Sequence, residues 1–283
     1  MNIRTDLVTE EKELHTEEIE GALTEVFEQN GITVEKTVIQ TEKSAHRLNK
    51  PKGTYFTLTF DNLQHLCDPE PLVDVICQVL SVLLPKHRDN VLTVGLGNRE
   101  ITPDALGPLT ADKLLVTRHI GKDFIKRYGL QGLQSVSAIT PGVIGKTGIE
   151  TFEIVQGTVA RTSPSALIVI DALAARRPER LCRTLQLTDT GICPGSGVHN
   201  SRKAINADFF GIPVIALGIP TVVDTGSLVF DLTGQKIGSA EEEMMVTPKD
   251  IDQLVDRAAS ILADALNRFL QPDLDREVLR CLA

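Results

Sequence analysis

Residues 167–174 read Leu-Ile-Val-Ile-Asp-Ala-Leu-Ala, a run of four branched aliphatic side chains that ends at Asp171. Such a short apolar run is typical of a strand buried on both faces of a parallel sheet. Val91–Leu96 has the same character and leads through a glycine loop to Asp104. In open α/β sheets the ligand crevice lies at the carboxyl ends of the strands. The two segments therefore predict a buried sheet that carries two aspartates at one crevice.

Strand-like and helix-like segments alternate over the rest of the chain. The predicted strands are Leu114–Thr117, Thr184–Thr188 and Val214–Leu217, and the predicted helices are Pro69–Leu84, Gly121–Tyr128, Gly148–Arg161, Asn200–Phe210 and Lys249–Leu270. This alternation predicts an α/β fold, a doubly wound and mostly parallel sheet with helices on both faces.

The N-terminal third has a different pattern. Residues 8–30 are rich in glutamate and end at Asn30-Gly31, which predicts an amphipathic helix closed by a turn. Ile32–Gln40 and Thr54–Phe60 alternate β-branched and polar residues and predict two strands. We expect a single domain over residues 1–283, with residues 32–60 as a β-rich subregion.

Composition narrows the classes of protein. The 42% hydrophobic and 24% charged residues are those of a globular chain. The net charge of −9, without a block of Lys or Arg, argues against a nucleic-acid partner. No apolar stretch reaches the roughly 20 residues that span a bilayer, so we expect no membrane partner and a cytoplasmic location. The five cysteines lack Cys-x-x-Cys spacing and predict neither a disulfide framework nor a thiolate metal site.

Two carboxylates at one crevice favour acid–base chemistry. Desolvation and a like charge raise one of the two pKa values, so that the pair shares a proton. One carboxylate then activates water as a base, and the other protonates a leaving amine. The alternative for each aspartate taken singly is that it caps the helix that follows, because Asp is a favoured N-cap residue. Position along the chain leaves both interpretations of Asp104 and Asp171 open.

Glycine-rich segments surround the aspartates. Gly95-Leu96-Gly97-Asn98 lacks the third glycine of a dinucleotide loop, which favours close backbone approach or N–H groups aimed at an oxyanion. The segment 140–148 contains Gly-Lys-Thr, but Thr140 stands where a Walker A loop has its first glycine. Asp189-Thr190-Gly191 is interpreted as a turn at a strand end. Ser196 and His199 are three residues apart, too close in sequence to predict a serine triad.

Taken in order, these segments resemble the germination protease family. The resemblance is carried by Val94–Pro108, by Thr140–Thr151, by Ile-Asp-Ala-Leu-Ala-Ala-Arg at 170–176, and by Asp-Thr-Gly-Ile-x-Pro-Gly-Ser-Gly-Val at 189–198. Shorter matches lie at 4–7, 212–224 and 245–252, so the similarity covers most of the chain.

The resemblance implies an endopeptidase that begins the degradation of small acid-soluble spore proteins when a spore germinates. It places the two essential aspartates at Asp104 and Asp171, and it implies a fold related to hydrogenase maturation proteases. It also implies a homotetramer in the forespore and spore core, made as a zymogen that removes its own N-terminal piece. Family members cut after an acidic residue and before an apolar one, so residues 1–6 would be the propeptide and Asp6–Leu7 the processed bond.

We expect the substrate groove to be lined by residues of the glycine-rich segments, namely Gly97, Asn98, Gly142, Gly145, Gly195, Ser196 and His199. Two features depart from the family pattern: the chain is shorter between Asp224 and Met245, and His199 stands where a glycine is expected. No cofactor and no metal is expected. The alternatives are a metal-dependent maturation-type endopeptidase, with His199 or Asp189 as a third ligand, and a non-catalytic phosphate- or nucleotide-binding module.

Overall fold

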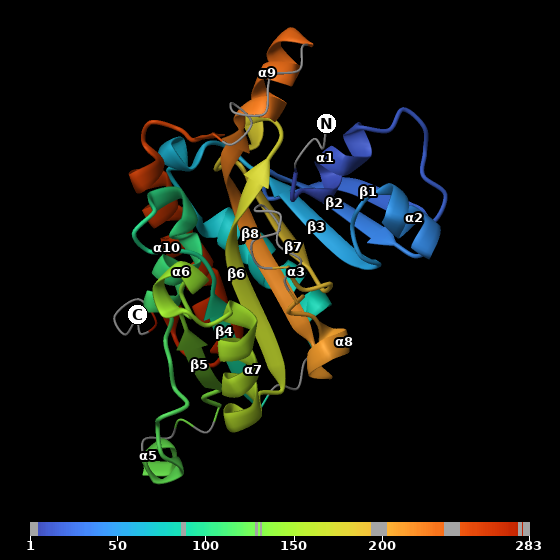
Figure 1. The fold of residues 1–283 in the computed structure, drawn as a ribbon. Coiled ribbons are helices and arrows are strands. Elements are labelled where there is room, and N and C mark those ends of the chain that lie inside the picture. Colours follow the sequence, from blue (N-terminus) through green and yellow to red (C-terminus); the bar gives the residue numbers. More distant parts are fainter. Residues whose placement is uncertain are drawn as a thin grey trace.

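The chain folds around one nine-stranded sheet, seen in Figure 1. A computed structural model describes residues 5–85, 89–127, 130, 132–193, 203–234, 244–276 and 279. The strands are β1 (Ala22–Gln29), β2 (Ile32–Ile39), β3 (Gly53–Thr59), β4 (Asn90–Gly95), β5 (Ser135–Ile139), β6 (Ala166–Ala175), β7 (Thr184–Thr188), β8 (Val214–Asp224) and β9 (Met245–Val246). Their order across the sheet is β1-β2-β3-β7-β8-β6-β4-β5, and β9 pairs with β8.

The sheet has a parallel half and an antiparallel half. Parallel pairings join β5 to β4, β4 to β6 and β6 to β8. Antiparallel pairings join β8 to β7, β7 to β3, β3 to β2 and β2 to β1. The α/β class with helices on both faces is confirmed, but the sheet is mixed rather than mostly parallel. The difference arises because β7 and β8 pair antiparallel, and β3 then adds the β1–β3 meander to that edge.

Helices cover both faces of the sheet. They are α1 (Val8–Glu13), α2 (Glu42–Arg47), α3 (Glu70–Leu83), α4 (Leu106–Asp112), α5 (Lys122–Arg127), α6 (Ile144–Thr147), α7 (Thr151–Thr162), α8 (Ala207–Phe210), α9 (Thr225–Thr233) and α10 (Ile251–Leu270). α3, α4 and α10 pack against the face that carries Ile168 and Ile170, and α7 and α8 pack against the face that carries Leu167 and Val169 (Figure 1). No described helix is long and apolar enough to cross a membrane.

The N-terminal helix is shorter than predicted. α1 ends at Glu13, and residues 22–29 form the edge strand β1. Asn30 and Gly31 have φ values of 52° and 77°, as in the two-residue turns that join antiparallel strands. The turn pairs Gln29 with Ile32, and this pairing decides the conformation of a segment that periodicity assigns to a helix.

Other boundaries also differ. Leu114–Thr117 is not a strand, because its main chain is held by α10: Asn267 Oδ1 accepts from the Leu115 N–H at 2.8 Å, and Asn267 Nδ2 donates to the Lys113 carbonyl at 3.1 Å. β5 was missed. The helix predicted over residues 200–210 is limited, in the part that the structure describes, to α8.

Candidate active site

Asp104 is held in the loop that follows β4, as the last residue of the short 3-10 helix η2 (Thr102–Asp104). Its Oδ2 accepts from the Asn98 N–H at 2.7 Å. Gly97 has φ +110°, and a Cβ there would lie 2.0 Å from the Asp104 carbonyl oxygen, so the position requires glycine. The Gly95–Asn98 segment therefore serves the close backbone approach that was predicted, and Asn98 acts through its main chain.

Asp171 lies inside β6 and not at its end. It pairs with Gly218 of β8, so the strand continues past the aspartate that was expected at its carboxyl end. The parallel pairing of β6 with β4 stops one residue earlier, at Gly95 and Ile170, so Asp171 stands where the neighbouring strand ends. Its Oδ1 accepts from the N–H of Ala172 at 2.9 Å.

The two aspartates influence each other electrostatically. Desolvation raises the pKa of Asp171 well above its usual range, and the negative charges of Asp104 and then Asp6 raise it further. Desolvation also raises the pKa of Asp104, while the hydrogen bond from the Asn98 N–H lowers it. Neither aspartate caps a helix: the residue before α4 is Ala105, and α4 has no side-chain cap. Two desolvated carboxyls with raised pKa values are the kind of pair that is able to share a proton.

The loop between β5 and α7 approaches the Asp104 loop. Lys146 Nζ forms an ion pair with Glu100, which lies in the loop that holds Asp104. Gly142 accepts the Thr151 hydroxyl on its carbonyl at 3.2 Å, and Gly145 lies in α6 with open space where a Cβ would stand. The other expected groove residues, Gly195, Ser196 and His199, lie outside the described residues.

The N-terminal segment docks beside the aspartates. Asp6 donates its N–H to the Ala174 carbonyl at 2.9 Å, and its Oδ2 accepts from the Ala174 N–H at 2.7 Å. Leu7 is fully buried against Leu173, Ala175 and Val223. Residues 5–8 are therefore part of the packed structure.

A buried carboxylate fastens this segment. Glu10 of α1 is fully buried, and its carboxylate accepts from the hydroxyl of Thr5 and from the N–H groups of Arg176 and Arg177, at 2.7 and 2.9 Å. Sequence analysis missed Glu10, because it is one of several glutamates in a Glu-rich stretch and its burial depends on the loop after β6.

Gln186 of β7 was also missed. It is 7% exposed, and its carboxamide contacts Asp6 and Val8. The available signal was a long polar residue between two leucines in a short strand, Thr184–Thr188.

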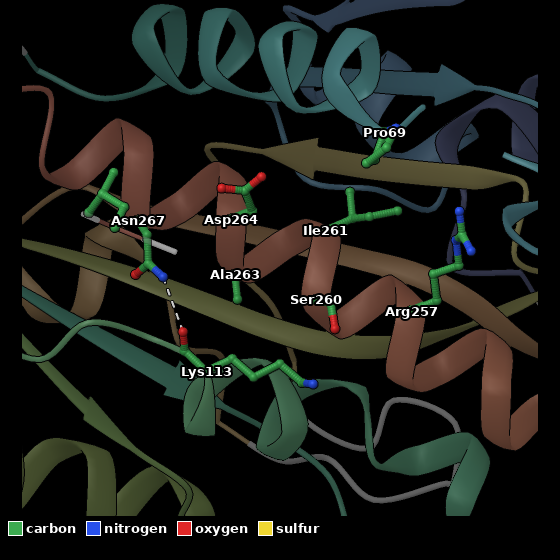
Figure 2. A pocket seen from close by; sticks show the side chains of 9 residues that line it. Pro69, Lys113, Arg257, Ser260, Ile261, Ala263, Asp264 and Asn267 are labelled. Atoms are coloured by element: carbon green, nitrogen blue, oxygen red, sulfur yellow. Dashed lines mark hydrogen bonds between the residues drawn. The ribbon is translucent and has the colours of Figure 1, made fainter. Parts of the chain in front are cut away.

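Two further features lie away from the pair. Asp189, one proposed third metal ligand, accepts from the Thr54 N–H at 2.8 Å, and no group of three His, Cys, Asp or Glu side chains placed to hold a metal occurs among the described residues. A cavity of about 450 Å³ runs along α10, lined by Lys113, Arg257 and Ile261 among others (Figure 2). Neither aspartate lines it, so it is separate from the candidate active site.

Comparison with known proteins gives the class. The sequence profile described as germination protease matches residues 2–237. The germination proteases of Caldanaerobacter subterraneus subsp. tengcongensis, Clostridium tetani and Bacillus pumilus are 37%, 36% and 35% identical; the alignments cover 100%, 98% and 97% of this chain and 98%, 98% and 95% of theirs. These matches make this α/β protein a peptide hydrolase. The chain belongs to the germination protease family.

The crystal structure of the NiFe hydrogenase maturation protease HycI from Thermococcus kodakarensis KOD1 aligns at 17% identity and a TM-score of 0.41, over 69% of this chain and 98% of that one.

Proposed function

We propose that this protein is the endopeptidase that initiates degradation of small acid-soluble spore proteins during spore germination, with Asp104 and Asp171 as its catalytic pair. The observation that supports this most is the desolvated, mutually repelling pair of carboxyls at the step where β4 ends and β6 continues. Such a pair shares one proton. The ionised carboxyl takes a proton from water as the water oxygen adds to the peptide carbonyl carbon, and the protonated carboxyl gives its proton to the departing nitrogen.

We also propose that residues 1–6 are a propeptide and that the bond processed is Asp6–Leu7. The support is the docking of this bond: an acidic residue hydrogen-bonded to Ala174 of β6 is followed by an apolar residue in a buried pocket. The charge of Asp6 raises the pKa of Asp171, so the segment lies within electrostatic reach of the pair. A segment that is covalently attached has a high effective concentration at its own groove.

Assembly and location complete the proposal. We place the enzyme in the cytoplasm of the forespore and the spore core, as a homotetramer. The edge strand β1 exposes Leu23, Val26 and Phe27, and an exposed apolar edge of this kind favours pairing with another chain. Light scattering at micromolar concentration tests the assembly: a strict monomer with full activity would contradict it.

Cleavage of a purified small acid-soluble spore protein tests the catalytic pair. Asp104→Asn and Asp171→Asn should each lower kcat at least about 100-fold, because an amide supplies neither the acid nor the base. Asp112→Asn, a surface carboxylate that pairs with Arg99, is the matched control and should keep its rate. Folded Asp104→Asn and Asp171→Asn variants that both cleave at the wild-type rate would refute the pair, and loss of activity in a chelator would favour the metal-dependent alternative.

A further inference from the structure

Gln186 lies in register with Asp171 across the centre of the sheet. Asp171 pairs with Gly218 of β8, Gly218 pairs with Gln186 of β7, and Gln186 pairs with Thr57 of β3. Paired residues of neighbouring strands project to the same face, so these side chains form one row on the face opposite α10. Gly218, in the middle of the row, has no side chain that would stand between Asp171 and Gln186.

The N-terminal segment crosses the sheet over this row. Asp6 is hydrogen-bonded at β6, Val8 at β7, and Thr9 at β3, where its hydroxyl lies 3.1 Å from that of Thr57. The Asp6–Leu7 bond therefore spans the interval between the strand of Asp171 and the strand of Gln186.

The carboxamide of Gln186 is hydrogen-bonded to the main chain on both sides of Leu7. Its Nε2 donates to the Asp6 carbonyl oxygen at 3.0 Å, which is the carbonyl of the Asp6–Leu7 bond. Its Oε1 accepts from the Val8 N–H at 2.7 Å. A carboxamide carries a donor and an acceptor side by side, as these two contacts require.

We propose that Gln186 is the residue that positions the substrate peptide, with its Nε2 on the carbonyl of the bond to be cut and its Oε1 on the N–H one residue beyond that bond. The inference rests on the proposed function, in which the Asp6–Leu7 segment occupies the place of a substrate.

The chemistry gives Gln186 a role beyond binding. When water adds to the carbonyl carbon, negative charge develops on the carbonyl oxygen, and a fixed N–H donor there stabilises the transition state more than the ground state. Gln186 is held in a strand and almost fully buried, so the donor needs little reorganisation.

The test uses the full-length chain and a synthetic peptide that copies residues 2–11. At a pH at which the new carboxyl is ionised, Gln186→Glu keeps the size but removes the donor, and it should lower kcat for the peptide about 100-fold with a smaller change in KM. Self-processing at Asp6–Leu7, followed by mass spectrometry, should slow in parallel. Gln64→Glu makes the same change at an exposed position and should be without effect. Gln186→Met, which is of similar size and has no donor in any protonation state, decides the matter if Gln186→Glu does not fold or stays protonated.

Three outcomes would overturn the inference. Folded Gln186 variants with wild-type kcat would show that this residue does not act on the substrate. Slower self-processing with unchanged peptide cleavage would show that Gln186 only holds the N-terminal segment in place and does not act on the substrate. A wild-type chain that cuts neither itself nor the peptide would remove the proposed function first, and the inference with it.

Discussion

The two faces of the central strands differ completely within one residue. On β6, β8 and β7, the residues Ile170, Leu217 and Leu187 point to one face and are at most 1% exposed under α3, α4 and α10. Their immediate neighbours Asp171, Gly218 and Gln186 point to the other face, where the N-terminal segment is hydrogen-bonded to Gln186.

The difference separates stability from chemistry. The helix-covered face is held by apolar burial, which is strong and non-directional. Beyond the part that α7 and α8 cover, the opposite face holds a desolvated carboxylate and is covered by a short segment that is fixed by hydrogen bonds and by the buried Leu7. Three substitutions test this division, in order of decreasing effect.

Leu266 of α10 represents the apolar face, where it is fully buried. Leu266→Ala should lower the free energy of unfolding by about 3 kcal/mol, because it removes buried methyl groups and leaves a cavity. Urea unfolding measures the loss, and kcat of the folded enzyme should be unchanged. Leu232→Ala, at a position 75% exposed, should cost less than about 0.5 kcal/mol. Equal costs at the two positions would break the comparison.

Glu10 represents the polar fastening of the other face. Glu10→Ala should destabilise the chain by about 2 kcal/mol, because the N–H groups of Arg176 and Arg177 lose their acceptor. Hydrogen exchange should rise in residues 5–12 while β6 and β8 stay protected. Glu13 lies on the same helix as Glu10 and forms an exposed ion pair with Arg180. Glu13→Ala removes this pair and should lower the free energy of unfolding by less than about 1 kcal/mol. Unchanged exchange in residues 5–12 would show that Glu10 does not hold the segment.

The ionised carboxylate of Asp171 should destabilise the folded chain at neutral pH. Its folded-state pKa is raised, so the folded chain binds more protons than the unfolded one. Stability then falls as the pH rises from the ordinary aspartate value of 3.8 through the raised folded value. Asp171→Asn keeps the shape without the charge and should stabilise the chain by about 1 kcal/mol at neutral pH. The gain should vanish near pH 3, where the wild-type carboxyl is protonated. Urea unfolding across this range that finds no gain at neutral pH would contradict the raised pKa.

Much of the fold was predictable from local pattern. β2, β4 and β7, with α3, α7 and α10, lie within a few residues of their predicted bounds, because their apolar periodicity matches the face they bury. β1 was not predictable in this way: its Glu-rich sequence has no buried face, and only pairing with β2 makes it a strand.

By itself, the sequence determined the family, the α/β class and the glycine that lets the Asp104 loop approach, and it predicted Asp104 and Asp171 as the site. The tertiary structure decided which residues join them. β6 continues past Asp171 because β8 still offers it a partner, and Gln186 lies beside the Asp6–Leu7 bond because three strands distant in sequence share one register. Hydrogen-bond register between strands depends on both partners at once, and local sequence therefore did not reveal Gln186 or Glu10.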